Sequence, residues 1–340
     1  MKQTKMKPSE PILLLAAVDV GASELVVALD TGGQRAVHTH PNTAGGQRLL
    51  LRRLLAAGAP VRVAMESTGV YGLGLALRLA AHPGIEVMVI NPRAVRDFLR
   101  AGMTRAKTDR IDALGILDYL RRMPFVRWQP PQADVLMLQQ LTRRLTQLKT
   151  ERVREKNRLH AIAQTPARAG FLARDLRSHI AHLAGRIAKL EKEALRVAQG
   201  STRMAGSLEL LTSVPGIALK SGLRILGELQ MLPKGLKAPQ WVAHAGLDPR
   251  PFESGTSVNK PRRLSKTGNA HLRAALFLPA LVAVRHNAQV AACYQALLAR
   301  GKKPKQAVIA IMRKLLHAIW GILHHQQPFN PSLFYQPKSA

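Results

Sequence analysis

Cysteine and aromatic residues are scarce in this chain. Its 340 residues include one cysteine, Cys293, so a disulfide framework or a cysteine-based zinc cluster within one chain is excluded. A single cysteine is also typical of a reducing cytoplasm. Aromatic residues make up 4% of the sequence, too few for a protein that binds single strands by stacking many bases on aromatic rings.

Long hydrophobic runs are also missing. The apolar run at residues 12–18 is followed by Asp19 and carries no small-residue cleavage pattern, so it reads as a strand and not as a signal peptide. The run at residues 274–284 is too short to cross a bilayer. We therefore expect a cytoplasmic protein with no membrane partner.

Carboxylates are absent from the last quarter of the chain. Glu253 is the final acidic residue, and residues 254–340 carry 13 Lys or Arg. The whole chain has 51 Lys plus Arg against 20 Asp plus Glu, a formal charge of +31. Such an excess repels itself unless a polyanion is the normal partner, and nucleic acid is the leading candidate.

The length of the chain indicates two or three domains. We expect an α/β domain over residues 1–127, a basic helical region over 128–200 that begins in a linker near Trp128, a mostly helical domain over 201–327, and a poorly ordered tail over 328–340. Most acidic residues lie before Asp175. Acid chemistry is thus expected in the first domain and anion binding in the last.

The first domain alternates predicted strands and helices. Strands are expected at residues 12–19, 24–30, 35–39, 61–65 and 86–90, and helices at 46–57, at 71–82, from Pro92 and from about Asp109. The expected order is three strands, a helix, a strand, a helix, a strand and then further helices. This order suggests a ribonuclease-H-like (RuvC-like) sheet.

Four acids follow this pattern. Asp19 ends the first strand, Glu66 ends the fourth, and Asp109 and Asp112 share one face at the start of a helix. Four carboxylates that reach one point would hold Mg²⁺ through oxygen ligands and could orient a phosphoryl-transfer centre. The alternative is that they are ordinary strand-end and helix-capping acids.

The middle of the chain predicts long helices. Leucines at 138, 141, 145 and 148, and apolar residues at 176, 180, 183, 187 and 190, form the seams of two helices that break near residues 166–170. Such seams can pair with each other or with another chain. Residues 208–229 read as helix, Pro-Gly turn, helix; this segment resembles a phosphate-gripping helix-hairpin-helix, although Ala218 replaces its second glycine, and a plain helical hairpin fits equally well.

The stretch from Ala243 to Leu276 combines hydroxyls with cations. A turn-rich loop carries Ser254, Thr256 and Ser257, and a basic run with Arg262, Arg263 and Lys266 follows it. A loop hydroxyl walled by cations is what attack on a phosphodiester needs. A solvated surface loop is the alternative. Helices are expected at residues 271–283 and 305–317.

Several motifs resemble one known family. VDVG with Asp19, AMESTGVY with Glu66, VINP and KTDRIDA look like the DEDD half of the insertion sequence 110 family of bacterial transposases. SVPGI, AHAGLDPRPFESGTSV and RLSKTGNAHLRAAL look like its serine-bearing half.

The resemblance implies a recombinase guided by a non-coding bridge RNA, in which one RNA loop pairs with target DNA and another with donor DNA. It further implies a homo-oligomer, a dimer or tetramer, in which the acidic site of one subunit meets the serine of another. Carried over to this chain, the catalytic residues are Asp19, Glu66, Asp109, Asp112 and Ser254, the acids hold Mg²⁺, and Arg262, Arg263, Lys266 and Arg273 contact nucleic acid.

Two other classes of function remain open from the sequence. A metal-dependent, structure-specific nuclease of the resolvase type would use water as the nucleophile and need no serine. A non-catalytic nucleic-acid scaffold would leave the acids without a role. Positive charge is common to all three readings and does not discriminate among them.

Overall fold

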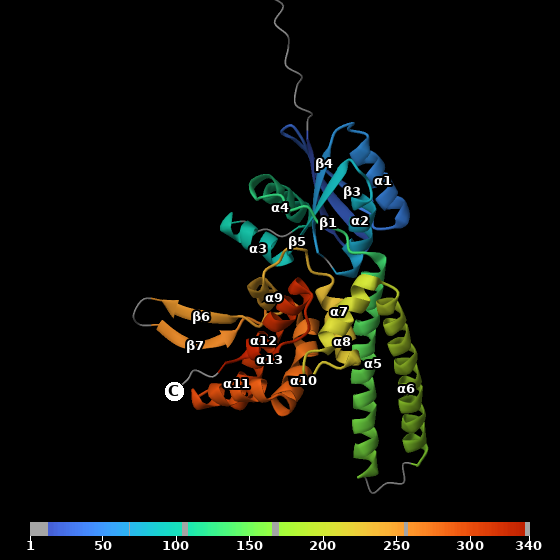
Figure 1. The fold of residues 1–340 in the computed structure, drawn as a ribbon. Coiled ribbons are helices and arrows are strands. Elements are labelled where there is room, and N and C mark those ends of the chain that lie inside the picture. Colours follow the sequence, from blue (N-terminus) through green and yellow to red (C-terminus); the bar gives the residue numbers. More distant parts are fainter. Residues whose placement is uncertain (1–12, 68, 104–107, 165–169, 255–257, 337–340) are drawn as a thin grey trace, which may run out of the picture. The chain divides into compact units, whose positions relative to one another are not determined.

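A computed structural model describes residues 13–67, 69–103, 108–164, 170–254 and 258–336. The chain divides into two compact units, residues 1–130 and residues 131–340, which we call the N-terminal and C-terminal units. Figure 1 labels their helices and strands. Trp128, expected in a linker, belongs to the first unit, where its amide donates to the carbonyl of Val87 and its ring packs against the core.

The N-terminal unit is built on one five-stranded sheet. Its strand order is β3-β2-β1-β4-β5; β1, β2 and β3 run antiparallel, and β4 and β5 run parallel to β1. This is the strand order of a ribonuclease-H-like sheet and confirms the expected fold class. The strands are β1 (Leu14–Val20), β2 (Glu24–Thr31), β3 (Gln34–Pro41), β4 (Val61–Glu66) and β5 (Ile85–Ile90).

Helices cover both faces of this sheet. Ala16 and Val18 of β1 pack into a core with α1 (Ala44–Leu55) and α2 (Val70–Ala80), whereas Ala17 packs into a second core with α3 (Pro92–Ala101) and α4 (Asp109–Arg122). Neighbouring residues of a strand point to opposite faces, so a strand covered on both sides is apolar at nearly every position. That explains why the short runs at residues 12–18 and 25–29 are apolar at every position.

The C-terminal unit begins with two long helices, α5 (Ala133–Ala163) and α6 (Gly170–Gln199), which pack against each other. Leu138, Leu145, Leu183 and Ile187 of the predicted seams are buried, so the seams pair within one chain. Residues 165–169, where the break was expected, lie outside the described part of the chain. Of the two alternatives, pairing of the two seams with each other is therefore the one observed.

The remaining helices share the core of that seam. They are α7 (Thr202–Thr212), α8 (Leu219–Leu229), α9 (Ala238–His244), α10 (Ala270–His286), α11 (Ala288–Ala299), α12 (Pro304–His325) and α13 (Pro331–Phe334). Gly216, in the Pro-Gly turn between α7 and α8, has a φ of +85°, and a Cβ there would lie 2.3 Å from the carbonyl oxygen of Pro279. The turn is therefore packed tightly on α10.

The end of the chain differs from the expected tail. Phe334 of α13 is buried in the core, and Lys314 Nζ donates to its carbonyl oxygen at 3.2 Å. The expectation of a poorly ordered segment from Pro328 is thus wrong for the described residues up to 336. Pro328, Asn330 and Pro331 favoured a loop, and the burial of Phe334 was not evident from the sequence.

By length and composition, α12 could cross a membrane, as could the α10–α11 pair were it not bent by 100°. Ile311, Leu315 and Ile319 of α12 are instead fully buried in the core of the C-terminal unit. That environment accounts for the apolar character of the helix.

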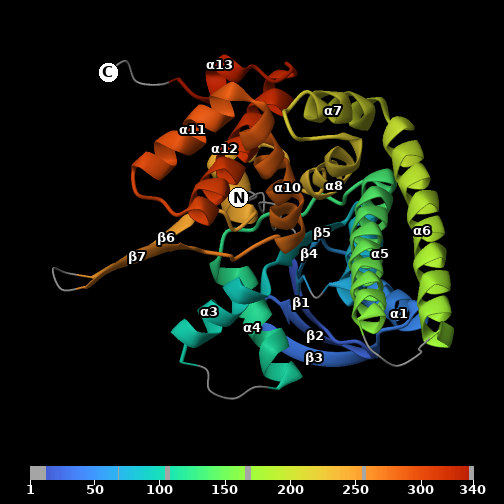
Figure 2. The same ribbon diagram turned by 90° about the horizontal axis from the view of Figure 1, so that it is seen from below.

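The stretch read as a loop contains a two-stranded hairpin. β6 (Pro249–Ser254) pairs antiparallel with β7 (Val258–Leu264), and the register shifts between Arg250 and Phe252. Both strands of such a pair are edges, where proline is tolerated because each strand has one side free of ladder bonds. Prolines in the sequence therefore suggested turns where there are strands. Both views show the hairpin extending away from the helices of its unit (Figures 1 and 2).

Candidate active site

Asp19 and Glu66 lie on adjacent parallel strands and on the same face of the sheet. Val18 of β1 is level with Met65 of β4, so the two acids are the next residues along their strands. Val18 and Met65 both point into the α1–α2 core. Because side chains alternate along a strand, Asp19 and Glu66 point to the opposite face, which α4 covers.

Helix α4 begins with two further acids. Thr108 caps the helix, and its Oγ1 accepts from the amide of Ile111 at 3.2 Å. Asp109 and Asp112 occupy the first turn, where the partial positive charge of the helix N-terminus stabilises carboxylates. They continue the stripe that buries Ala113 and Ile116 against the sheet, so they face Asp19.

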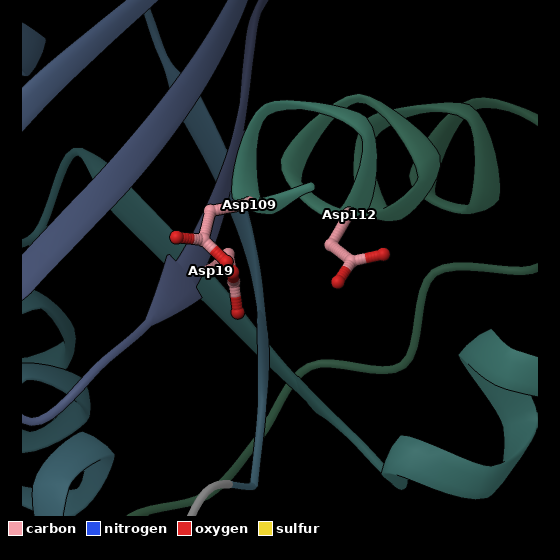
Figure 3. A group of neighbouring side chains, drawn as sticks. All are labelled: Asp19, Asp109 and Asp112. Atoms are coloured by element: carbon pink, nitrogen blue, oxygen red, sulfur yellow. The ribbon is translucent and has the colours of Figure 1, made fainter. Parts of the chain in front are cut away.

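The structure brings three of the four predicted acids together. Asp19, Asp109 and Asp112 each offer a carboxylate oxygen, and these oxygens lie within 4.8 Å of one another. Figure 3 shows the Asp19 and Asp109 carboxylates side by side, with Asp112 reaching out from the helix. Glu66 stays outside this close group. Three carboxylates at such spacing repel one another unless a cation lies among them, and hard oxygen donors suit a divalent metal.

Two ion pairs fasten α4 to the sheet. Arg121 Nη1 lies 2.9 Å from Asp30 Oδ2 of β2, and Arg35 Nη2 of β3 lies 2.9 Å from Asp118 Oδ1. The other oxygen of Asp30 accepts from the amide of Gly33 at 2.7 Å. Sequence reasoning missed these positioning residues, because nothing in one sequence pairs residues 91 or 83 positions apart.

Ser254 is the last residue of β6 and pairs with Val258, the first residue of β7. It therefore lies where the hairpin turns. Thr256 and Ser257, and the side chains of Ser254 and Arg262, lie outside the described part of the structure. The backbone thus places the predicted nucleophile at the far end of an extended arm.

The predicted nucleic-acid contacts differ in exposure. Arg263 is exposed and lies opposite exposed Arg250 across the hairpin. Lys266 is exposed and has a φ of +51° in the segment that follows β7. Arg273 is half-buried, and its Nη1 donates to the carbonyl of Ala245 at 2.8 Å. Part of its guanidinium therefore supports the base of the hairpin.

Comparison with known proteins adds an independent finding. A model of DEDD-type IS110 transposases matches residues 16–165, and a model of transposases of the IS116/IS110/IS902 family matches residues 208–295. Together they cover more than half of the chain. The chain belongs to the IS110 family of transposases.

Two relatives and one solved structure show the range of similarity to this IS110-family transposase. The pilin gene-inverting protein of Moraxella bovis is 26% identical over 267 residues, which cover 78% of this chain and 81% of the relative. A 42 kDa protein of insertion element IS900 from Mycobacterium paratuberculosis is 28% identical over 131 residues, 36% of this chain and 31% of the relative. The Thermus thermophilus RuvC structure in complex with a Holliday junction substrate aligns with 34% of this chain and 99% of its own, with 15% identity and a TM-score of 0.27.

Membership of this family makes the chain an enzyme that acts on DNA as a transposase or recombinase. The acid cluster falls in the segment matched by the first model, and Ser254 falls in the segment matched by the second. Each half of the IS110-family transposase thus carries one set of candidate reactive groups.

Proposed function

We propose that this transposase cuts and rejoins DNA through a covalent phosphoserine at Ser254. The Ser254 hydroxyl gives its proton to solvent and its oxygen attacks the phosphorus. The Oγ–P bond forms as the bond to the leaving deoxyribose oxygen breaks, and that oxygen takes up a proton to become a hydroxyl end. A hydroxyl end of another strand then attacks the phosphoserine and regenerates Ser254. The phosphodiester energy is kept, so no external energy source is needed. The observation that carries this proposal is that one matched half holds the carboxylate cluster of Asp19, Asp109 and Asp112 and the other matched half holds a hairpin alcohol.

The acid cluster would hold Mg²⁺ through Asp19, Asp109 and Asp112, with Glu66 at the adjacent strand end as a fourth ligand. Bound there, the metal supplies Lewis-acid polarisation of the phosphate. The fit rests on three hard oxygen donors whose mutual repulsion a divalent cation relieves. Arg262, Arg263 and Lys266 would neutralise phosphate charge near the serine.

A bridge RNA is proposed to choose the DNA sequences, with one loop pairing with target DNA and another with donor DNA. The support is the resemblance of the motifs and a charge of +31. The chain would then recognise RNA by shape and backbone while base pairing supplies specificity. We propose a homo-oligomer in which the acids of one subunit act with Ser254 of another.

The test is to trap the intermediate. Purified protein, bridge RNA and labelled DNA are incubated with Mg²⁺, quenched in denaturant and run on a denaturing gel. Wild-type protein should carry DNA covalently, Ser254→Ala should not, and Ser257→Ala is the control for losing a hydroxyl of the same segment. Protein-linked DNA that persists in Ser254→Ala would show that another group is the nucleophile.

A metal-dependent nuclease is the competing function, because the acid cluster alone could activate water. It predicts cleaved DNA with free 5′-phosphate ends, no DNA on the protein, and unchanged cleavage by Ser254→Ala. The same gel therefore separates the two reactions. DNA binding that ignores metal, with no strand breakage by any variant, would instead favour a scaffold.

A further inference from the structure

One buried carboxylate in the C-terminal unit joins three separate segments. The side chain of Glu228 on α8 is 3% exposed. Its Oε1 accepts from Arg143 Nε at 2.8 Å, and its Oε2 accepts from Arg143 Nη2 at 2.9 Å and from Asn269 Nδ2 at 2.7 Å. Gln139 Nε2 lies 3.3 Å from Oε2. Arg143 and Gln139 belong to α5, so Glu228 connects α5 to Asn269 through α8.

This carboxylate is charged at neutral pH. Burial by itself raises the pKa of Glu228, but the hydrogen bonds from Arg143 and Asn269, with the charges of Arg143 and His271, outweigh burial and lower the pKa. Hydrogen bonds to a charged acceptor in a buried site are stronger than neutral ones. The connection between the segments is therefore an electrostatic clamp and not a passive contact.

Asn269 stands where the hairpin joins the helices. Its Oδ1 caps α10 by accepting from the amide of Leu272 at 3.0 Å, and its own amide donates to the carbonyl of His244 at 2.6 Å. Four residues beyond the end of β7, Gly268 has a φ of +128°, and a Cβ on it would lie 2.2 Å from that same carbonyl oxygen. Residues on the two sides of the hairpin thus meet at Asn269.

A second bond closes the base of the hairpin. Ser265 Oγ donates to Asp248 Oδ1 at 2.5 Å, and the Ser265 amide donates to the Asp248 carbonyl at 3.0 Å. Beyond this base, β6 and β7 pair with each other and extend away from the helices (Figures 1 and 2). Five strand steps from Pro249 to Ser254 span roughly 17 Å. A small tilt at the base therefore becomes a large displacement of Ser254.

We propose that Glu228 is a positioning residue for strand exchange: by clamping Asn269 to Arg143 of α5, it fixes the direction in which the β6–β7 hairpin presents Ser254. This inference rests on the proposed function, in which Ser254 is the nucleophile. It assigns a role in the reaction to a residue that does not touch the reacting atoms.

The chain offers a control in a second ion cluster, whose carboxylate is partly buried, with 18% of the Glu191 side chain exposed. Glu191 of α6 lies 2.7 Å from Lys149 Nζ of α5 and 2.7 Å from Lys220 Nζ of α8. It joins the same helices α5 and α8 through a carboxylate with two cationic partners. The described contacts of Glu191 include none to the base of the hairpin, so its loss should affect stability without redirecting Ser254.

The decisive variant is Asn269→Ser, because serine is as good a helix cap as asparagine but cannot donate the amide hydrogen to Glu228. Asn269→Ser and Glu228→Gln should form the covalent protein–DNA complex at least ten-fold more slowly, with unchanged affinity for DNA. Hydrogen exchange of the amides in residues 258–264 should become faster in both. Glu191→Gln should lower Tm but leave the rate per folded molecule and this exchange unchanged.

Wild-type rates and wild-type exchange in Asn269→Ser and Glu228→Gln would overturn the inference. An equal loss of rate in Glu191→Gln would overturn it as well, because the effect would then be one of general stability. Ser254→Ala, run in parallel, separates the two proposals. If it still forms covalent complexes, the nucleophile assignment fails, whereas the exchange of residues 258–264 still reports whether Glu228 clamps the hairpin.

Discussion

The two units hold their candidate reactive groups in opposite ways. The acids of the N-terminal unit sit on a central strand and on a helix packed against it, above a core that is buried on both faces. Ser254 sits at the end of a hairpin whose two strands pair only with each other within the two-stranded sheet. Core packing fixes the position of the acids, whereas a few hydrogen bonds at the base of the hairpin fix the position of Ser254. The position of the acid cluster is therefore expected to depend less on any single hydrogen bond than the direction of the serine arm does.

The largest effect should come from Asp19→Asn. Losing one carboxylate from the cluster removes one of the proposed metal ligands and should slow DNA cleavage by on the order of 10³-fold, the equivalent of several kcal/mol of transition-state stabilisation. Titration calorimetry with Mn²⁺ should show weaker binding with no change in the fold. Asp97→Asn, an exposed acid of α3 paired with Arg93, is the control. Unchanged Mn²⁺ affinity in Asp19→Asn would place the metal elsewhere.

Much of the N-terminal unit could be predicted from the sequence. Apolar runs bounded by Gly21, Gly32 and Gly33 mark strands that are short and buried on both faces, and Asn91 before Pro92 marks a capped helix. The acids stand at a strand end and in a helix first turn, so their convergence follows once the strand order is assumed. The tighter grouping that leaves Glu66 aside depends on side-chain geometry, which spacing does not encode.

The C-terminal unit was less predictable because its decisive contacts are long-range. Pro249 and Pro251 favour turns locally, yet a two-stranded hairpin tolerates them at its edges. Glu228 reads as one acid in an apolar helix, and its partners lie 85 and 41 residues away. No local sequence pattern predicts such a clamp. Helix α11 was not expected, because His286 and Asn287 interrupt the apolar pattern in front of it.

Gly268→Ala should test the base of the hairpin with an intermediate effect. A Cβ there meets a backbone oxygen at 2.2 Å in a conformation that L residues rarely adopt, so the substitution should destabilise the C-terminal unit by about 1–3 kcal/mol. Gly235→Ala is the control, since Gly235 also has a positive φ, +84°, but has open space around its Cβ position. Denaturant unfolding should show a larger loss for Gly268→Ala. Equal losses would mean that the destabilisation comes from backbone strain at a positive φ and not from the close contact with His244.

The two ion pairs that hold α4 should differ in strength, and breaking the weaker one should give the smallest effect. Arg121 and Arg35 are equally exposed, at 40% and 39%, but Asp30 is 5% exposed and Asp118 is 32% exposed. Arg121→Met removes the arginine partner of the buried Asp30 carboxylate and should lower the free energy of unfolding by about 1–3 kcal/mol. Arg35→Met breaks a solvent-exposed pair and should lower the free energy of unfolding by about 0–1 kcal/mol.

Hydrogen exchange of the β1 and β2 amides in low denaturant measures this difference within the intact protein. The same variants also report on the acid site, because a loosened α4 moves Asp109 and Asp112 relative to Asp19. Arg121→Met should therefore weaken Mn²⁺ binding, and Arg35→Met should leave it near the wild-type value. If both substitutions cost the same, burial of Asp30 does not decide the strength of its pair. If neither alters Mn²⁺ affinity, the packing of Ala113, Ile116 and Leu117 holds α4 on the sheet without help from charge.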